Sequence, residues 1–303
     1  MSEDKNIPAS IRQRLLNKAH NTNRPFIETL QYYAIERFLY RISRSGYADK
    51  FILKGALLFK AWDTSIYRPT RDIDLLGFTT NELDSARKIF QEFCDQGVEP
   101  DGLLFDKETV KSERITEDAD YEGIRINLIG YLGKAKIPLQ IDIGFADVVT
   151  PAPINLKYPT ILSMPAPNLR SYPIESVVAE KVQALVFLGS INSRMKDFYD
   201  LWIMADHFDF DGQKLQLAIV NTFKRRNTTL PSEIPTGLSE NFASDKQTQW
   251  QAFLMRIRID SVPVPLNDIS SVLRNFLMPP LQACTTGTKF EGVWKSGGPW
   301  NVE

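Results

Sequence analysis

The sequence predicts an α+β protein in which a mixed domain of strands and helices is followed by a mainly helical one. Short strand patterns alternate with helical ones over residues 1–150, a proline-rich connection covers 151–173, and helical periodicity dominates 174–303. The chain has 303 residues, of which 43% are hydrophobic and 24% are charged. This composition is typical of a globular protein with enough apolar side chains for a sizeable core.

The overall charge and the few cysteines limit the class of protein. The formal net charge is −1 and the pI is about 6.2, so RNA binding requires a local basic patch. Lys224-Arg-Arg226 is the only concentrated basic run, and a solvated helix end explains it more simply. Cys94 and Cys284 lie far apart in the sequence, which argues against a secreted fold built on disulfides. No stretch approaches the roughly 18 apolar residues of a membrane span. We therefore expect a soluble cytoplasmic protein without membrane contact.

The first domain is predicted to begin with helices. Apolar residues recur every three or four positions between residues 10 and 43, which indicates a core-facing helical stripe. Its residues are Ile27, Leu30, Ala34, Phe38 and Ile42. A short buried strand or helix start is expected at 51–59, a strand at 72–76, a helix at 81–97, and strands at 124–132 and 138–145.

The second half begins after six prolines between Pro151 and Pro173, a segment that cannot be a continuous helix or a central strand. It is the predicted domain boundary. Helical patterns then cover 175–188, 196–207, 211–225, 247–256 and 267–276. The tail from 285 to 303 contains Trp294 and Trp300, which predicts that it docks on the protein body.

The most informative acidic pattern is Asp72-Ile-Asp74. Alternate side chains of a strand share a face, so both carboxylates point one way while Ile73 and Leu75 point toward the core. Such a pair suits Mg²⁺, which takes a few carboxylate oxygens and completes its coordination with water and substrate phosphates. The pattern alone is more often explained by two ordinary surface acids, because such triplets are common.

A third acid strengthens the functional interpretation. The segment Leu139–Phe145 alternates so that Asp142 lies on the face opposite its apolar residues. If this strand neighbours the strand of Asp72 and Asp74, three carboxylates converge, as two-metal phosphoryl or nucleotidyl transfer requires. Asp142 is then a metal ligand or the base for an acceptor hydroxyl.

Residues before the acids are candidates for phosphate binding. In Lys54-Gly-Ala56, the glycine lets the backbone approach a phosphate. Arg68 and Arg71 can pair with phosphates or with the acids themselves. P-loop and Rossmann glycine motifs are absent from the sequence, and two isolated histidines give no protease or hydrolase constellation.

Two further candidates lie in the helical half. Lys181 is at the border of an apolar helical stripe, where a lysine either extends to water or neutralises an anion in a cleft. Asp197 and Asp200 share a helix face one turn apart. The simpler explanation for this pair is a surface contact with Arg194 and Lys196.

Taken together, these motifs resemble a known family. The segments, in chain order, are Lys54-Gly-Ala56, Arg68-Pro-Thr-Arg-Asp-Ile-Asp-Leu75, Asp142, Ala179-Glu-Lys181 and Arg194-Met-Lys-Asp-Phe-Tyr-Asp-Leu201. The set resembles the AbiEii-type nucleotidyltransferase toxins of type IV toxin–antitoxin systems. The resemblance extends over nearly the whole chain, and the combination is more specific than any one motif.

The resemblance implies a polymerase-β-like nucleotidyltransferase domain with a mixed sheet, joined to a helical domain that completes the active site. It implies an NTP substrate with Mg²⁺, or Mn²⁺ in its place, and metal binding by Asp72 and Asp74. Gly55 and its neighbours then face the triphosphate, Lys181 contacts phosphate, and Asp197 or Asp200 completes the site. The implied acceptor is RNA, with the tRNA 3′ end as the best candidate. A toxin of this class also implies a cognate antitoxin encoded nearby.

The chain departs from the family pattern at two positions. Ala56 stands where relatives commonly carry Ser or Gly, and Leu185 stands where some carry a second basic residue. Two alternatives remain open. One is a metal-dependent glycosyltransferase, whose sites also use an Asp-x-Asp pair. The other is a non-catalytic nucleotidyltransferase fold that binds a nucleotide or a partner protein.

Overall fold

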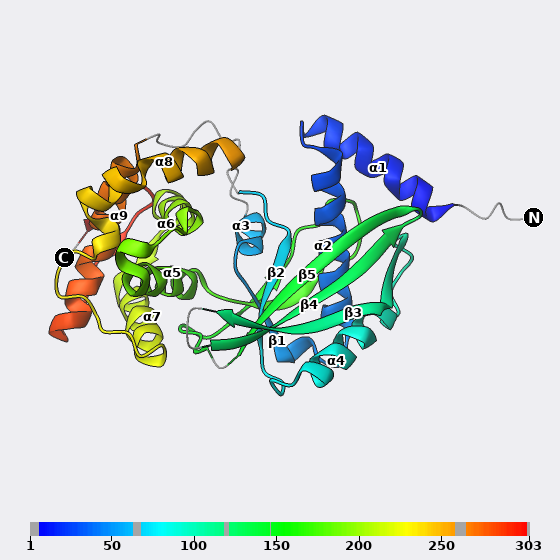
Figure 1. Ribbon diagram of the computed structural model, residues 1–303, viewed down its shortest axis with the longest axis horizontal. Helices are drawn as coiled ribbons and strands as arrows, with labels where there is room; N and C mark the ends of the chain where they lie inside the picture. Colours follow the sequence, from blue (N-terminus) through cyan, green and yellow to red (C-terminus); the bar gives the residue numbers. More distant parts are fainter. Residues whose placement is uncertain (1–5, 63–67, 118–120, 146, 258–264, 302–303) are drawn as a thin grey trace, which may run out of the picture. The chain divides into compact units, whose positions relative to one another are not determined.

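The computed structural model describes residues 6–62, 68–117, 121–145, 147–257 and 265–301. The chain divides into two compact units (Figure 1). The first, the sheet unit, comprises Met1–Asp63, Pro69–Ala146 and Ile154–Ser171. The second, the helical unit, comprises Thr64–Arg68, Asp147–Pro153 and Tyr172–Glu303. Each unit is therefore assembled from segments that are separate in the sequence.

Within its described residues, the sheet unit contains a seven-stranded sheet in the order β3-β4-β5-β2-β1-β7-β6. The strands are β1 Phe51–Lys54, β2 Asp72–Gly77, β3 Leu103–Glu117, β4 Tyr121–Leu132, β5 Ala135–Phe145, β6 Ile154–Lys157 and β7 Asn168–Ser171. The β2–β5 and β1–β7 pairs are parallel and the others are antiparallel. The predicted mixed sheet of an α+β fold is confirmed.

Four helices accompany the sheet within the described residues: α1 Ile7–Asn21, α2 Phe26–Arg44, α3 Leu57–Ala61 and α4 Leu83–Asp95. Helix α2 packs on β5 and β7, α4 packs on β3 and β4, and the two helices touch each other (Figure 1). The ring of Phe38 in α2 lies 6.1 Å from Phe90 of α4 and 5.0 Å from Phe105 of β3. Ile27 was expected in this core, but it is 72% exposed because it lies in the first turn of α2, before that helix meets the sheet.

The helical unit contains α5 Ile174–Leu188, α6 Met195–His207, α7 Gly212–Arg225, α8 Glu240–Ile257 and α9 Leu266–Thr286. Three two-residue strands, β8 Phe210–Asp211, β9 Val293–Trp294 and β10 Trp300–Asn301, join the tail to it. The indole N–H of Trp294 donates to the Ala205 carbonyl at 2.7 Å, and that of Trp300 donates to Phe276 at 2.8 Å. The expected docking of the tail is confirmed.

The proline-rich segment 151–173 is more than a connection. It contains β6 and β7, and residues Ile154–Ser171 belong to the sheet unit. Its prolines flank these two short strands, where no backbone N–H is needed for the ladder. In the basic run, Lys224 and Arg225 are exposed as expected of a helix end, but Arg226 pairs with Asp147 and Glu180, each at 3.3 Å.

Among the described residues, no helix combines the length and apolarity needed to cross a membrane.

Candidate active site

The two acids of β2 lie on the face of the strand opposite the core. Ile73 and Leu75 are 0% and 2% exposed, whereas Asp72 and Asp74 are half-buried. This alternation follows from the two-residue period of a strand, in which the apolar side chains pack beneath the sheet. Both carboxylates are therefore presented on one surface of a rigid element, as the sequence predicts.

Gly55 follows β1 directly and lies beside Asp74. Lys54 is the Cα partner of Asp74 in the antiparallel β1–β2 pair. The whole Lys54 residue is 6% exposed. Gly55 has φ +74°, and a Cβ placed on it would lie 2.8 Å from the Cβ of Asp74 and closer still to its carboxylate. Glycine is needed here for the left-handed backbone and for the room that Asp74 takes. Ala56, 7% exposed, then leads into α3 and supplies no hydroxyl.

Asp142 lies next to Asp74, because these two residues are Cα partners in the parallel β2–β5 pair. Its carboxylate accepts two hydrogen bonds from Arg125 of β4, Nε to Oδ1 and Nη2 to Oδ2, each at 2.8 Å. The hydrogen bonds from Arg125 to Asp142 raise the pKa of the arginine. Asp142 is therefore close to Asp74, as the sequence predicts. Both of its carboxylate oxygens, however, accept hydrogen bonds from Arg125.

A second cluster of charged residues lies within the helical unit. Lys181 of α5 contacts two acids of α6, with Nζ at 2.6 Å from Asp197 Oδ1 and 2.9 Å from Asp200 Oδ2. Arg68 approaches Asp200 with Nε at 2.8 Å from Oδ1 and Nη2 at 2.9 Å from Oδ2. Arg194 Nε lies 3.3 Å from Asp197 Oδ2. Each carboxylate therefore pairs with Lys181 and with one arginine.

Burial determines how these groups titrate. The side chain of Asp200 is 1% exposed, and burial alone would raise its pKa, but Arg68 and Lys181 outweigh this effect and lower its pKa to about 2. Burial alone would lower the pKa of Lys181, yet the charges of Asp197 and Asp200 raise it. Asp200 and Lys181 are thus held in their charged forms at neutral pH. The simpler prediction places this aspartate pair on the surface, which is wrong because both aspartates are buried, although its predicted contact between Asp197 and Arg194 is present.

Comparison with known proteins assigns the chain to a family. A model of the AbiEii nucleotidyl transferase toxin family of type IV toxin–antitoxin systems matches residues 37–275, which is more than half of the chain. The chain belongs to this family. The family assignment agrees with the mixed sheet and with the polymerase-β-like fold expected from the sequence.

Two solved structures are similar to this AbiEii-family chain. The crystal structure of JHP933 from Helicobacter pylori is similar at 13% identity and a TM-score of 0.42, covering 84% of this chain and 90% of that one. A putative nucleotidyltransferase from H. pylori is similar at 14% identity and a TM-score of 0.40, covering 84% and 93%. No curated protein matches the chain.

The donor atoms on β2 suit the divalent metal that nucleotidyltransferases generally use. Asp72 and Asp74 offer hard carboxylate oxygens on one face, and Mg²⁺ commonly takes its other ligands from water and substrate phosphates. Across the described part of the chain, no three His, Cys, Asp or Glu side chains are grouped so that they could hold a metal ion. Asp142 as a third ligand or base stays a prediction that requires release of Arg125.

Two partners in this AbiEii chain were missed by sequence reasoning. Arg125 lies in the alternating segment 124–132, and its position on the polar face of that strand was the available signal. Arg68 and Asp200 are 132 positions apart in the sequence, and no local pattern predicts that they pair. Arg71 is exposed, and its role in nucleotide binding stays a prediction.

Proposed function

We propose that this AbiEii-family chain transfers a nucleoside monophosphate from an NTP to an RNA acceptor. In the reaction, an acceptor hydroxyl oxygen forms a bond to the α-phosphorus while the bond from that phosphorus to the β-phosphate oxygen breaks. Pyrophosphate leaves with the electron pair of the broken bond, and the hydroxyl proton passes to a base. A divalent metal, Mg²⁺ or Mn²⁺, would supply charge neutralisation and orientation of the triphosphate when bound.

The observation that carries the proposal is the pair Asp72 and Asp74 on one face of β2, beside a glycine that leaves room for Asp74. Membership of a nucleotidyl transferase family supports nucleotidyl rather than glycosyl transfer for this pair of acids. Lys54 and the backbone at Gly55 are the nearest candidates for triphosphate contacts, because Lys54 is the strand partner of Asp74. Asp142 is the candidate base once Arg125 releases it.

The finer parts of the proposal concern the acceptor and the biological effect. We infer that the acceptor is tRNA at its 3′ end, so that modification blocks translation and growth. Lys181, with Asp197 and Asp200, is proposed as a further part of the catalytic machinery, as the family resemblance implies. A cognate antitoxin is the expected partner, since the family belongs to type IV toxin–antitoxin systems.

The test is a transfer assay with purified protein, total RNA, Mg²⁺ and each α-labelled NTP in turn. Label on tRNA-sized RNA is expected with the native chain and is expected to disappear in Asp72→Ala/Asp74→Ala. A matched control is Asp84→Ala/Asp95→Ala, which removes two exposed carboxylates from α4 of the same unit. Equal labelling by both double variants would refute the proposal, and no labelling with any NTP would favour a non-catalytic binding protein.

A further inference from the structure

A basic hollow lies within the helical unit, where the start of α6 meets the last turns of α8. Its volume is about 460 Å³. The lining residues that matter for binding are Arg194, Lys196, Arg256, Ser193, Gln249 and Phe253. Three of them are cations, two offer neutral polar groups, and none of the described residues that line the hollow is acidic. The net charge of the whole chain is −1, so this is a local excess of positive charge.

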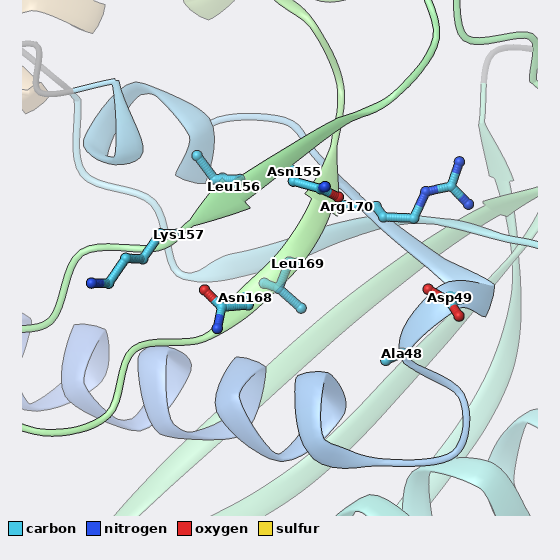
Figure 2. A pocket seen from close by; sticks show the side chains of 8 residues that line it. All are labelled: Ala48, Asp49, Asn155, Leu156, Lys157, Asn168, Leu169 and Arg170. Atoms are coloured by element: carbon cyan, nitrogen blue, oxygen red, sulfur yellow. The ribbon is translucent and has the colours of Figure 1, made fainter.

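A second hollow, of about 500 Å³, provides a comparison (Figure 2). It lies beside the β6–β7 ribbon of the sheet unit and contains the cations Lys157 and Arg170 together with the carboxylate of Asp49. Figure 2 shows that the side chains of Lys157 and Arg170 extend in opposite directions. This hollow is therefore less positive than the one beside α6, and its cations do not converge.

We propose that the hollow beside α6 binds the phosphate backbone of the acceptor RNA, an inference that rests on the proposed function. Guanidinium groups match phosphate oxygens with paired donors, and an ammonium group acts as a point charge. Lys196 and Arg256 are exposed, so an RNA can contact both side chains from the protein surface. Phosphate binding by such residues releases counterions and supplies affinity that does not depend on base sequence.

One residue connects this hollow to the Lys181 cluster. Arg194 lines the hollow and also pairs with Asp197 at 3.3 Å. The other oxygen of Asp197 lies 2.6 Å from Lys181. A phosphate in the hollow competes with Asp197 for the guanidinium of Arg194, so bound RNA alters the balance of charge around Asp197 and Lys181. The geometry thus links acceptor binding to the residues proposed for catalysis.

The test compares Lys196→Ala/Arg256→Ala with Lys157→Ala/Arg170→Ala, which removes the same amount of charge from the second hollow. Binding of a fluorescent tRNA-sized RNA is measured over a series of salt concentrations. The α6 variant is expected to bind roughly tenfold more weakly at low salt, and its log–log salt slope is expected to fall by roughly 1.5 in magnitude. The control variant is expected to bind as the native chain does.

The outcomes separate this inference from the proposed function. If the native chain transfers nucleotide to RNA and both variants bind RNA equally, the hollow is not the RNA site although the proposed function stands. If the native chain neither binds nor labels RNA, both proposals fall. If Lys196→Ala/Arg256→Ala binds RNA as the native chain does but no longer binds poly-glutamate, the hollow is a surface for an acidic protein. That result would overturn the RNA assignment. Lys196→Gln/Arg256→Gln serves as a second variant if the alanine variant does not fold.

Discussion

The ion-pair network around Lys181 predicts that its members contribute very differently to stability. Asp200 lies within hydrogen-bonding distance of both Arg68 and Lys181, and its side chain is 1% exposed. Asp200→Asn therefore leaves Arg68 facing a neutral amide and Lys181 with Asp197 as its remaining acid, and removal of one partner from a buried pair typically costs about 3 kcal/mol. The lowered pKa of Asp200, about 2, gives a similar figure of about 2 kcal/mol for the charged carboxylate.

Lys181→Met is expected to cost much less. Asp200 keeps Arg68 at 2.8 Å, and Asp197 keeps Arg194 at 3.3 Å, so no carboxylate becomes unpaired. We expect this variant to lose less unfolding free energy than Asp200→Asn does, while losing nucleotidyl transfer.

Urea denaturation followed by tryptophan fluorescence measures the difference, since four of the five tryptophans lie in the helical unit. The stabilisation by Asp200 should be present above the ordinary carboxyl pKa and should disappear as the pH falls toward 2. Equal destabilisation by Lys181→Met and Asp200→Asn at neutral pH would refute the reasoning.

Three other predictions follow from single sites. Gly55→Ala should displace Asp74 and lower the unfolding free energy by more than about 1 kcal/mol, whereas Gly46→Ala, with open space around its Cβ position, should be nearly neutral in the same denaturation assay. Burial raises the pKa of Glu36 to about 7, so stability should fall as the pH rises from about 4.5 to 7, and Glu36→Gln should flatten this dependence by up to about 1.4 kcal/mol per pH unit. Trp294→Ala should cost about 3 kcal/mol by undocking the tail, and an unchanged melting curve would contradict this role.

The parts of the fold with strong periodicity were predictable from sequence. Strands β2 and β5 were predicted because polar and apolar residues alternate over Asp72–Leu75 and over Leu139–Phe145, and burial of Ile73 and Ile141 follows that alternation. The parallel pairing of β2 with β5 was assumed and not predicted, because the sequence carries no local signal for the register between distant strands. The helices α5, α6 and α7 were predicted within a few residues, because their apolar residues recur at intervals of three and four.

Other elements have weak or misleading local patterns. Strand β3 was not predicted, because its many charged residues do not alternate clearly with apolar ones. Its pairing with β4 also shifts register between Asp106 and Lys111. Helix α9 continues through Pro279 and Pro280 beyond its predicted end, although proline normally breaks a helix; tertiary packing of Leu281 outweighs that preference. The pairing of Arg68 with Asp200 depends on tertiary structure and could not be read from spacing, whereas the position of Arg125 on the polar face of β4 was a local signal.

We propose that Asp72 and Asp74 bind the divalent metal of a nucleotidyltransferase. The most direct test is Mn²⁺ binding in the presence of a non-hydrolysable NTP, measured by the electron paramagnetic resonance signal of free Mn²⁺. Asp72→Asn/Asp74→Asn should weaken Mn²⁺ binding by at least about tenfold, whereas Asp84→Asn/Asp95→Asn should leave it unchanged. Equal Mn²⁺ affinity in the native chain and the β2 variant would contradict the assignment.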